Sequence, residues 1–265
     1  MLAIGVIPAR YGSVRFPGKP LVSIAGKPLL QHVIEGARQA RRLHEILVAT
    51  DDVRIAEVAE KVGARAIMTD SALPSGTDRT WAALEAAKLT HADVVVNIQG
   101  DEPLVEGVPL DALVAAFDGR SHIEMATLGR ELDLATDDGQ AALLATTTAK
   151  IVVSKEDRAL YFSRYPIPFS RVGPEAARNA SSKETIEAIQ QSVLKHVGIY
   201  AFRPAFLRRF CAAAPCGLEV FEGLEQLRAL YLGAAIHVVR TRHESWGVDT
   251  PGDVEKIEQM LKSKF

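Results

Sequence analysis

The segment DVVVNIQ, residues 93–99, is apolar at consecutive positions rather than alternate ones, and it runs into the polar loop QGDEP, residues 99–103. Consecutive apolar residues predict a strand that is buried on both faces of a sheet. Earlier segments of the same kind are AIGVIP (3–8), EILVAT (45–50) and RAIMT (65–69), and helical patterns separate them. This alternation predicts an α/β fold with a mainly parallel sheet covered by helices on both faces.

The helical patterns are expected at about residues 28–42, after the strand at 45–50, at 79–90, and at the end of the chain at 251–262. For the second helix, Asp51 or Asp52 stands where an N-cap belongs, and Gly63 stands where the helix should stop. Further strands are expected within residues 124–130, 150–154, 159–164, 197–203 and 235–241. The polar stretch 172–192 fits either a surface helix or a mobile excursion.

The bulk composition indicates a globular protein. The chain has 265 residues, of which 48% are hydrophobic and 24% charged, with a net charge of −2. This charge argues against a broad nucleic-acid surface but allows a local basic pocket. No apolar run reaches the length of a membrane span, no basic leader precedes the first strand, and the two cysteines match no zinc pattern. We therefore expect a cytoplasmic protein with no membrane insertion, made of a single domain.

The loop after the first strand, IPARYGSVRFPGKPL (residues 7–21), carries Arg10, Arg15 and Lys19 among glycines. It is not a Walker loop, because one residue too many separates its glycines and Pro20 replaces the magnesium-binding hydroxyl. A turn with solvated charges is the simpler interpretation. However, ligands of parallel sheets bind beyond the carboxyl ends of the strands, and this position favours an anion site.

Two acidic positions suggest a divalent metal beside that anion. Asp101 and Glu102 follow the buried strand directly, and Asp249 stands in GVDTPGD (247–253). Pro103 directly follows Glu102, and Pro251 comes two residues after Asp249, so each position also fits the start of a helix. Magnesium, however, typically uses one or two carboxylates together with phosphate oxygens. With the basic loop, the pattern indicates metal-assisted chemistry on a nucleoside triphosphate.

Two further patterns allow more than one interpretation. SGTDR (75–79) combines a hydroxyl, a carboxylate and a guanidinium at a helix start, where Asp78 would cap the helix. His196 and Tyr200 alternate on one predicted strand and so point to one face. From the residues alone, His196 is equally a hydrogen-bonded core histidine or a site residue.

Together the motifs resemble one family. IPARYGSVRFPGKPL, ATDD, SGTDR, QGDEPL, ALYFSRYPIPF, HVGIYAFR, LEQLRAL and GVDTPGD occur in this order. From Ile4 to about Ile257 the chain is similar to the 3-deoxy-manno-octulosonate (Kdo) cytidylyltransferases. The resemblance implies a three-layer, nucleotide-diphospho-sugar transferase-like fold with a mixed, mainly parallel sheet and a dimerisation lobe. It implies attack of the Kdo anomeric hydroxyl on the α-phosphorus of CTP, which gives CMP-Kdo and pyrophosphate for lipopolysaccharide biosynthesis.

The resemblance also assigns residues, parts and partners. A nucleotide-binding part would cover about 1–130, a sugar-binding and dimerisation lobe about 131–240, and a metal loop with the closing helix 241–265. The implied partners are CTP, Kdo, Mg²⁺ and a second copy of the chain, and the implied catalytic residues are Arg10, Lys19, Asp101 and Asp249, of which the two aspartates hold the metal. Implied CTP contacts are Pro8, Ala9, Arg10, Ser13, Lys19, Ser75, Gly76 and Arg79, and implied sugar-acid contacts are Arg15, Gln99, Arg164, His196, Tyr200, Glu225 and Gln226.

The sequence departs from the family pattern in three places. Leu73 replaces a histidine before SGTDR, TTTA (146–149) replaces an asparagine-containing segment, and the stretch 172–192 is longer than usual. An alternative substrate is 8-amino-Kdo or another nonulosonic acid. A non-catalytic nucleotide-sugar binding protein is disfavoured by the retained Lys19, Asp101 and Asp249, and a dehydrogenase by the missing G-x-G-x-x-G.

Overall fold

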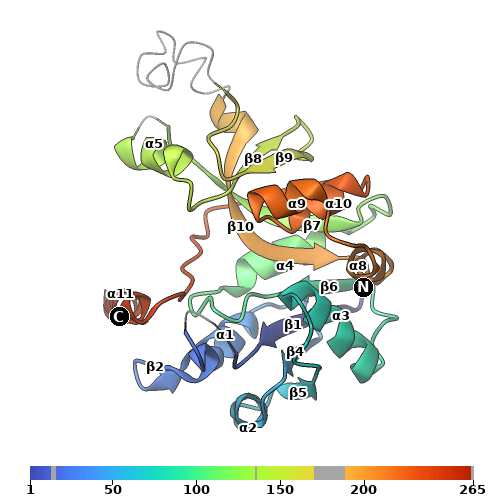
Figure 1. The fold of residues 1–265 in the computed structure, drawn as a ribbon, viewed down its shortest axis with the longest axis vertical. Coiled ribbons are helices and arrows are strands. Elements are labelled where there is room, and N and C mark those ends of the chain that lie inside the picture. The colour runs from blue at the N-terminus through green and yellow to red at the C-terminus, as the bar shows by residue number, and fades with distance from the viewer. Residues whose placement is uncertain (13–15, 135, 170–188, 264–265) are drawn as a thin grey trace. The chain divides into compact units, whose positions relative to one another are not determined.

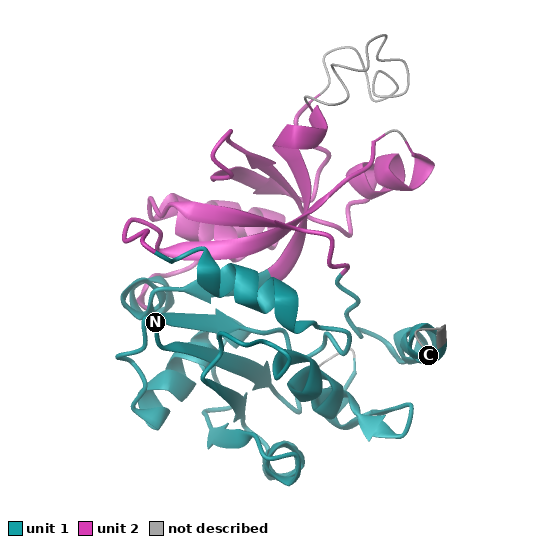
Figure 2. Ribbon diagram, turned by 180° about the vertical axis from the view of Figure 1, so that it is seen from behind, with its two compact units in different colours: residues 1–118, 199–211, 245–265 teal, residues 119–198, 212–244 magenta. Residues whose placement is uncertain are grey.

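The computed structural model describes residues 1–12, 16–134, 136–169 and 189–263, which divide into two compact units. Unit 1 is assembled from Met1–Asp118, Ile199–Cys211 and Ser245–Phe265, and unit 2 from Gly119–Gly198 and Ala212–Glu244 (Figure 2). Ser13, Arg15 and residues 172–188 of the long polar stretch lie outside the described residues.

Unit 1 contains the predicted parallel sheet (Figure 1). Its strands β6 (Val94–Asn97), β1 (Ala3–Ala9), β4 (Glu45–Thr50) and β5 (Arg65–Met68) lie side by side in this order, all parallel. The last residues of β10 (Val193–Phe202) pair with β6 in the antiparallel direction. The prediction of a mixed, mainly parallel sheet is confirmed.

This sheet is covered on both faces. β6 is buried at every position and β1 at all but one, and strands with an open face would be buried only at alternate positions. α3 (Gly76–Ala87) packs against all four parallel strands, and α1 (Leu29–Ala37) packs against β1, α2 (Val53–Lys61) and α4 (Gly107–Ala115). The remaining elements of the unit are η1 (Lys19–Leu21), the hairpin of β2 (Ser23–Ile24) and β3 (Lys27–Pro28), α8 (Pro204–Ala212) and α11 (Pro251–Ser263).

Capping residues fix the helix ends near the sheet edge. Asp52 caps α2 by accepting the amide of Arg54, and Gly63, at φ +75°, follows its end as expected. α3 begins earlier than predicted, because Ser75 and not Asp78 is its N-cap. Asp78 instead lies in the first turn, where its carboxylate accepts the Ser75 hydroxyl at 2.6 Å and suits the positive end of the helix dipole.

Unit 2 is built on β7 (Met125–Glu131), which pairs in parallel with β11 (Ile236–Thr241), and on an antiparallel set of β8 (Lys150–Val153), β9 (Ala159–Ser163) and the start of β10. Its helices are α5 (Asp137–Leu144), α9 (Gly217–Glu222) and α10 (Gln226–Tyr231). Leu128, Ile151, Phe162 and Val193 are fully buried and belong to its core.

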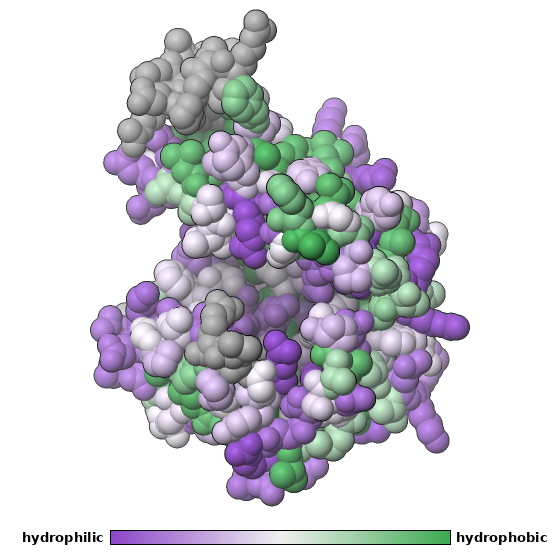
Figure 3. All heavy atoms as spheres, viewed as in Figure 1, coloured by the Kyte–Doolittle hydropathy of each residue, from purple (hydrophilic) through white to green (hydrophobic). Residues whose placement is uncertain are grey.

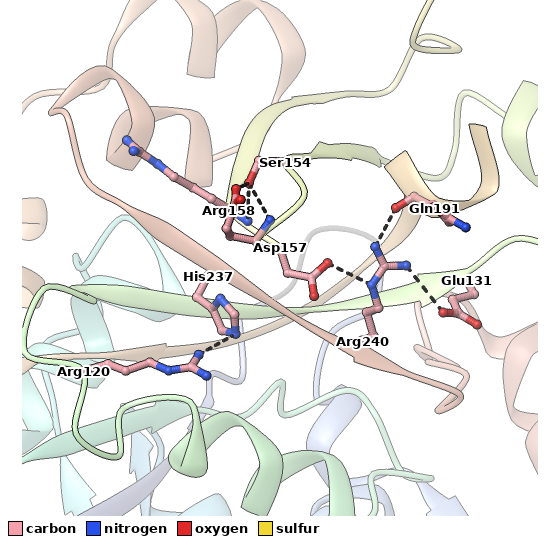
Figure 4. A network of polar contacts seen from close by, with 9 residues as sticks. Arg120, Glu131, Ser154, Asp157, Arg158, Gln191, His237 and Arg240 are labelled. Atoms are coloured by element: carbon pink, nitrogen blue, oxygen red, sulfur yellow. Dashed lines mark hydrogen bonds and ion pairs between the residues drawn. The ribbon is translucent and has the colours of Figure 1, made fainter. Parts of the chain in front are cut away.

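A polar network ties the turn between β8 and β9 to β11 (Figure 4). Arg240 donates to the carboxylate of Asp157 at 2.8 Å and pairs with Glu131 at 3.5 Å. The backbone of Val238 also donates to the carbonyl of Asp157 at 2.7 Å.

Among the residues described in either unit, no helix is long and apolar enough to cross a membrane.

Candidate active site

A pocket of about 260 Å³ in unit 1 lies where the carboxyl ends of β1 and β6 meet the loops that follow them. Because these strands are parallel, their carboxyl ends share one edge of the sheet, as the sequence pattern predicts. The pocket is lined by Pro8, Ala9, Arg10, Lys19, Pro20, Leu73, Ser75, Gly76, Arg79, Gln99, Gly100, Asp101 and Asp249.

Two glycines allow the backbone to form this pocket. Gly18 adopts φ +70° directly before Lys19, and its amide donates to the carbonyl of Tyr11 at 3.0 Å, which closes the opening loop. Gly100 lies in the loop after β6, and its backbone passes so near β1 that a Cβ atom there would overlap the carbonyl oxygen of Pro8. A side chain at either position would displace the backbone on which the charged residues stand.

Lys19 is the centre of the charged cluster. Its Nζ lies 2.7 Å from Asp101 Oδ2 and 3.6 Å from Asp249 Oδ1, although the two aspartates lie far apart in the sequence. The backbone supports this arrangement, because the amide of Val248 donates to the carbonyl of Asp101 at 2.9 Å. Lys19 is only 15% exposed, so its attraction to both carboxylates is screened less than that of a surface pair.

The chemistry of this cluster fits a magnesium ion. Asp101 and Asp249 offer hard carboxylate oxygens and are 32% and 49% exposed, so both are open to the pocket. Mg²⁺ is commonly bound by one or two carboxylates, with phosphate oxygens and water completing its shell. No group of three or more histidine, cysteine or acidic residues that could hold a metal by itself occurs in the described parts of the chain. The two aspartates are therefore the residues that would share a metal with a bound phosphate.

Arg79 lies at the inner wall of the pocket. Its side chain is 2% exposed and donates to Thr69 Oγ1 at 2.6 Å and to Asp51 Oδ2 at 3.3 Å. The pKa of Arg79 is lowered, chiefly because burial disfavours its charge, while the neighbouring charge of Asp51 acts in the opposite direction. The nearby Arg10 adds to the lowering, so the two arginines concentrate positive charge at one side of the pocket.

His196, on β10 in unit 2, is embedded in a hydrogen-bond chain. Gln226 Nε2 lies 3.5 Å from its Nδ1, its Nε2 lies 3.1 Å from Thr127 Oγ1, and Thr127 donates onward to the carbonyl of Val197. This network assigns the proton of a neutral ring to Nε2. Burial, and secondarily the charge of Arg164, lower the pKa of His196 to about 3. The histidine is therefore neutral at physiological pH.

Arg164 is held by backbone carbonyls in unit 2. Its guanidinium donates to the carbonyls of Glu222 at 3.1 Å, Thr147 at 3.4 Å and Gly223 at 3.4 Å. Its own backbone is held on both sides, since its amide donates to the Glu222 carboxylate at 2.9 Å and its carbonyl accepts the buried ammonium of Lys150. Glu222 and Lys150 thus fix the chain at Arg164.

Comparisons with known proteins place the chain in a family. A family model described as "Cytidylyltransferase" matches residues 4–237. The 3-deoxy-manno-octulosonate cytidylyltransferase of Bdellovibrio bacteriovorus is 47% identical over 264 residues, which cover 100% of this chain and 99% of that protein. This chain belongs to the 3-deoxy-manno-octulosonate cytidylyltransferase family.

Solved structures of cytidylyltransferases agree with the fold. A CMP:2-keto-3-deoxy-manno-octonic acid synthetase complexed with CTP is similar with a TM-score of 0.85 and 37% identity, and the match covers 100% of both chains. The 4-diphosphocytidyl-2C-methyl-D-erythritol synthase of Anaerococcus prevotii matches with a TM-score of 0.62 at 11% identity over 98% of both chains, and shows the fold alone. The predicted transferase-like fold is therefore confirmed.

For this cytidylyltransferase, the structure brings together every described residue that was expected at CTP or metal, since all of them line the pocket. Gln99, expected at the sugar acid, lines it too. Of the other sugar-acid residues, Tyr200 is buried in unit 1, whereas Arg164, His196, Gln226 and Glu225, which directly precedes α10, lie in unit 2.

Sequence reasoning missed several supporting residues of the cytidylyltransferase. It considered Asp51 as a helix cap and as part of the ATDD motif but gave it no role at the site, and it did not single out Lys150. Glu102, a buried carboxylate that accepts the Ser245 hydroxyl, was considered only as a cap or a metal ligand. The one available signal was the repeated acid in ATDD and QGDEP, which places two carboxylates where one cap would suffice.

Proposed function

We propose that this protein transfers CMP from CTP to the anomeric hydroxyl of Kdo, releasing pyrophosphate, and that it acts in the cytoplasm, where CTP is available. The observation that carries the proposal is the cluster of Lys19, Asp101 and Asp249 at the end of the parallel strands. Such a cluster suits a triphosphate with its metal, and the chain resembles along its whole length a CMP-Kdo synthetase that was solved with CTP.

In this mechanism the protein positions the reactants and balances charge. Arg10 and Lys19 face the triphosphate, and they stabilise the negative charge that grows on the departing pyrophosphate. Asp101 and Asp249 would hold Mg²⁺, which when bound polarises the α-phosphate and lowers the pKa of the attacking hydroxyl. Ser75 and Gly76, at the start of α3, would border the nucleoside together with Pro8 and Ala9.

For the sugar acid we propose contacts from Arg15, Gln99, Arg164, His196, Tyr200, Glu225 and Gln226. Ser13 is proposed to contact CTP. The support from the structure is chemical. The ring nitrogens of the neutral His196 lie against Gln226 and Thr127, so His196 would orient the Gln226 amide, a neutral polar group that suits a hydroxyl. A pocket of matched polar groups rejects analogues that leave its donors or acceptors unpaired.

Pyrophosphate release measured with each of the four ribonucleoside triphosphates, with and without Kdo, tests this function. We expect release only with CTP, only in the presence of Kdo, and with CMP-Kdo as the product. Equal amounts of 8-amino-Kdo and sialic acid are then compared with Kdo. Preference for 8-amino-Kdo would change the sugar but keep the reaction, whereas preference for sialic acid or another triphosphate would contradict the proposal.

The metal and triphosphate roles are tested by substitution. Asp101→Asn and Asp249→Asn each keep the shape of the side chain but remove a charge, so we expect turnover to fall by about 100-fold or more with the fold retained. Asp118→Asn is the matched control, because Asp118 pairs with Arg42 at the surface. Lys19→Met should lower turnover more than it raises the KM for Kdo, and the reverse pattern would move Lys19 to the sugar site.

We also propose that the protein is a homodimer formed through unit 2. α9 has no buried residue although it is largely apolar, and Leu218, Val220 and Phe221 are 44%, 72% and 92% exposed. α9 contacts α10, and α10 contacts β9. Tyr231 of α10 and Leu160 of β9 are also exposed. Figure 3 shows hydrophobic side chains gathered over this part of unit 2.

An exposed apolar surface of this kind is typical of a protein–protein interface, and two-fold homodimers are the commonest soluble oligomers. We expect sedimentation of the intact protein to give a dimer, and Phe221→Asp to shift it toward monomer. The control is Val108→Asp, which replaces an exposed apolar residue of unit 1. A wild-type protein that sediments as a monomer at all concentrations would contradict the dimer.

A further inference from the structure

Asp51 contacts both sides of the pocket without lining it. It follows β4 directly, and its side chain is only 11% exposed. One carboxylate oxygen, Oδ2, accepts from the guanidinium of Arg79 at 3.3 Å, and the other, Oδ1, accepts from the backbone amide of Tyr11 at 3.3 Å. The two partners belong to α3 and to the opening loop, which are separate walls of the pocket.

The contact on the α3 side places the Arg79 side chain. Arg79 donates to Thr69 at 2.6 Å as well as to Asp51, and Thr69 in turn donates to the carbonyl of Thr50, the last residue of β4. The guanidinium is therefore held at two points, by the residues that directly follow β4 and β5. Because the side chain is 2% exposed, water cannot replace a lost acceptor easily.

The contact on the loop side places the residues that surround Tyr11. Arg10 precedes Tyr11, and the Tyr11 carbonyl accepts the amide of Gly18, which precedes Lys19. A shift of the Tyr11 backbone therefore reaches both cations that face the triphosphate. Asp51 is the acceptor that fixes the Tyr11 amide to the sheet.

We propose that Asp51 is a positioning residue for the nucleotide, which holds Arg79 and the opening loop in the geometry that CTP requires. This inference rests on the proposed function. Two simple ideas about Asp51 predict opposite effects of its removal. If Asp51 acted only as a negative charge near a triphosphate, its neutralisation would tighten CTP binding. If it positions the two walls, its neutralisation weakens CTP binding.

The test measures CTP binding by calorimetry in EDTA, without sugar acid, for the wild type and for Asp51→Asn. We expect the Kd for CTP to rise about tenfold or more, because small displacements of binding groups are costly. In steady-state assays the KM for CTP should rise while the KM for Kdo stays within about twofold, since Asp51 touches only groups on the nucleotide side.

Asp52→Asn is the matched control. It removes the same charge one residue away, but Asp52 caps α2 and pairs with Arg54, which packs on the Tyr11 ring at 3.7 Å. Asp52 itself contacts neither Arg79 nor the Tyr11 amide, so the control keeps both hydrogen bonds of Asp51. We expect Asp52→Asn to lower the melting temperature without changing the Kd for CTP. Equal effects of the two variants would overturn the proposal, as would an unchanged or lowered Kd in Asp51→Asn.

Asp51→Glu serves if the asparagine variant fails to fold. It keeps the charge and moves the carboxylate by one methylene, so positioning predicts weaker CTP binding and a pure charge effect predicts none. An unchanged Kd in Asp51→Glu would overturn the proposal. The proposed function fails separately, if the wild type neither binds CTP nor transfers CMP to Kdo.

Discussion

His196→Gln should change how the stability of the protein depends on pH. The folded protein holds His196 neutral with a pKa of about 3, whereas an unfolded histidine titrates near 6.5. Between these values the unfolded chain binds a proton that the folded chain does not, so this residue makes the folded state less stable as the pH falls below about 6.5.

The size of the effect follows from the two pKa values. At pH 7.5 the unfolded histidine is almost uncharged, and the residue adds almost nothing to the pH dependence. At pH 5 its protonation stabilises the unfolded state by about 2 kcal/mol, and this figure holds for any folded pKa well below 5. In wild type, His196 therefore accounts for about 2 kcal/mol of lost stability between pH 7.5 and pH 5, which His196→Gln should not lose.

Urea unfolding at pH 7.5 and pH 5 measures this difference. We expect His196→Gln to be less stable than wild type at pH 7.5, because it disturbs the contacts with Gln226 and Thr127, and to approach the wild type at pH 5. His122→Gln, which replaces an exposed histidine, should follow the wild type at both values. If the gap between wild type and His196→Gln is the same at both pH values, His196 is not held neutral and the assigned network is wrong.

Three further predictions concern the supports of the site. Asp52→Ala should lower the free energy of unfolding by about 1 kcal/mol in urea titrations, because it removes the N-cap of α2. Lys150→Met should lower the free energy of unfolding by about 3 kcal/mol, because loss of the buried ammonium leaves several carbonyl oxygens without their donor. A variant as stable as the wild type in the same titration would contradict this explanation. Gly100→Ala should reduce kcat/KM about tenfold or more, since the new Cβ would overlap the Pro8 carbonyl oxygen. Gly76→Ala should be milder, because its new Cβ would come no closer than 3.2 Å, to the Pro8 ring. Equal losses of kcat/KM in the two variants would refute this steric argument.

The mainly parallel sheet and the edge that carries the pocket could be predicted from the sequence, because consecutive apolar residues between helices leave few arrangements other than a covered parallel sheet. That edge gathers the described members of the phosphate and metal set. The predicted extent of the first helix, to residue 42, was wrong. α1 ends at Ala37, and Gly107 at the start of α4 packs against the backbone of Gln39 and Ala40. Contacts from so far along the chain leave no periodic signal.

The roles of the two adjacent acids in ATDD could not be separated from the sequence either. Both Asp51 and Asp52 fit an N-cap, and only the folded backbone directs Asp52 to the helix and Asp51 to Arg79. Lys150 is a similar case, since its acceptors Ala145, Thr148 and Arg164 come from the segment before β8 and from the residue after β9. Local patterns report periodicity and caps, whereas these contacts depend on the tertiary fold.

Unit 1 is built from three separate pieces of the chain, and this has a consequence for how the protein is made. On the ribosome, Lys19 and Asp101 emerge before unit 2 is made, whereas Asp249 emerges only after both pieces of unit 2 have been synthesised. α11 then docks on the first piece, where Glu258 accepts the amide of Ala25 across 233 residues. Both pieces of unit 2 are therefore translated before the third piece of unit 1. A nascent chain that stalls before residue 249 therefore lacks part of the charged cluster, and the complete cluster can form only after unit 2 has been translated.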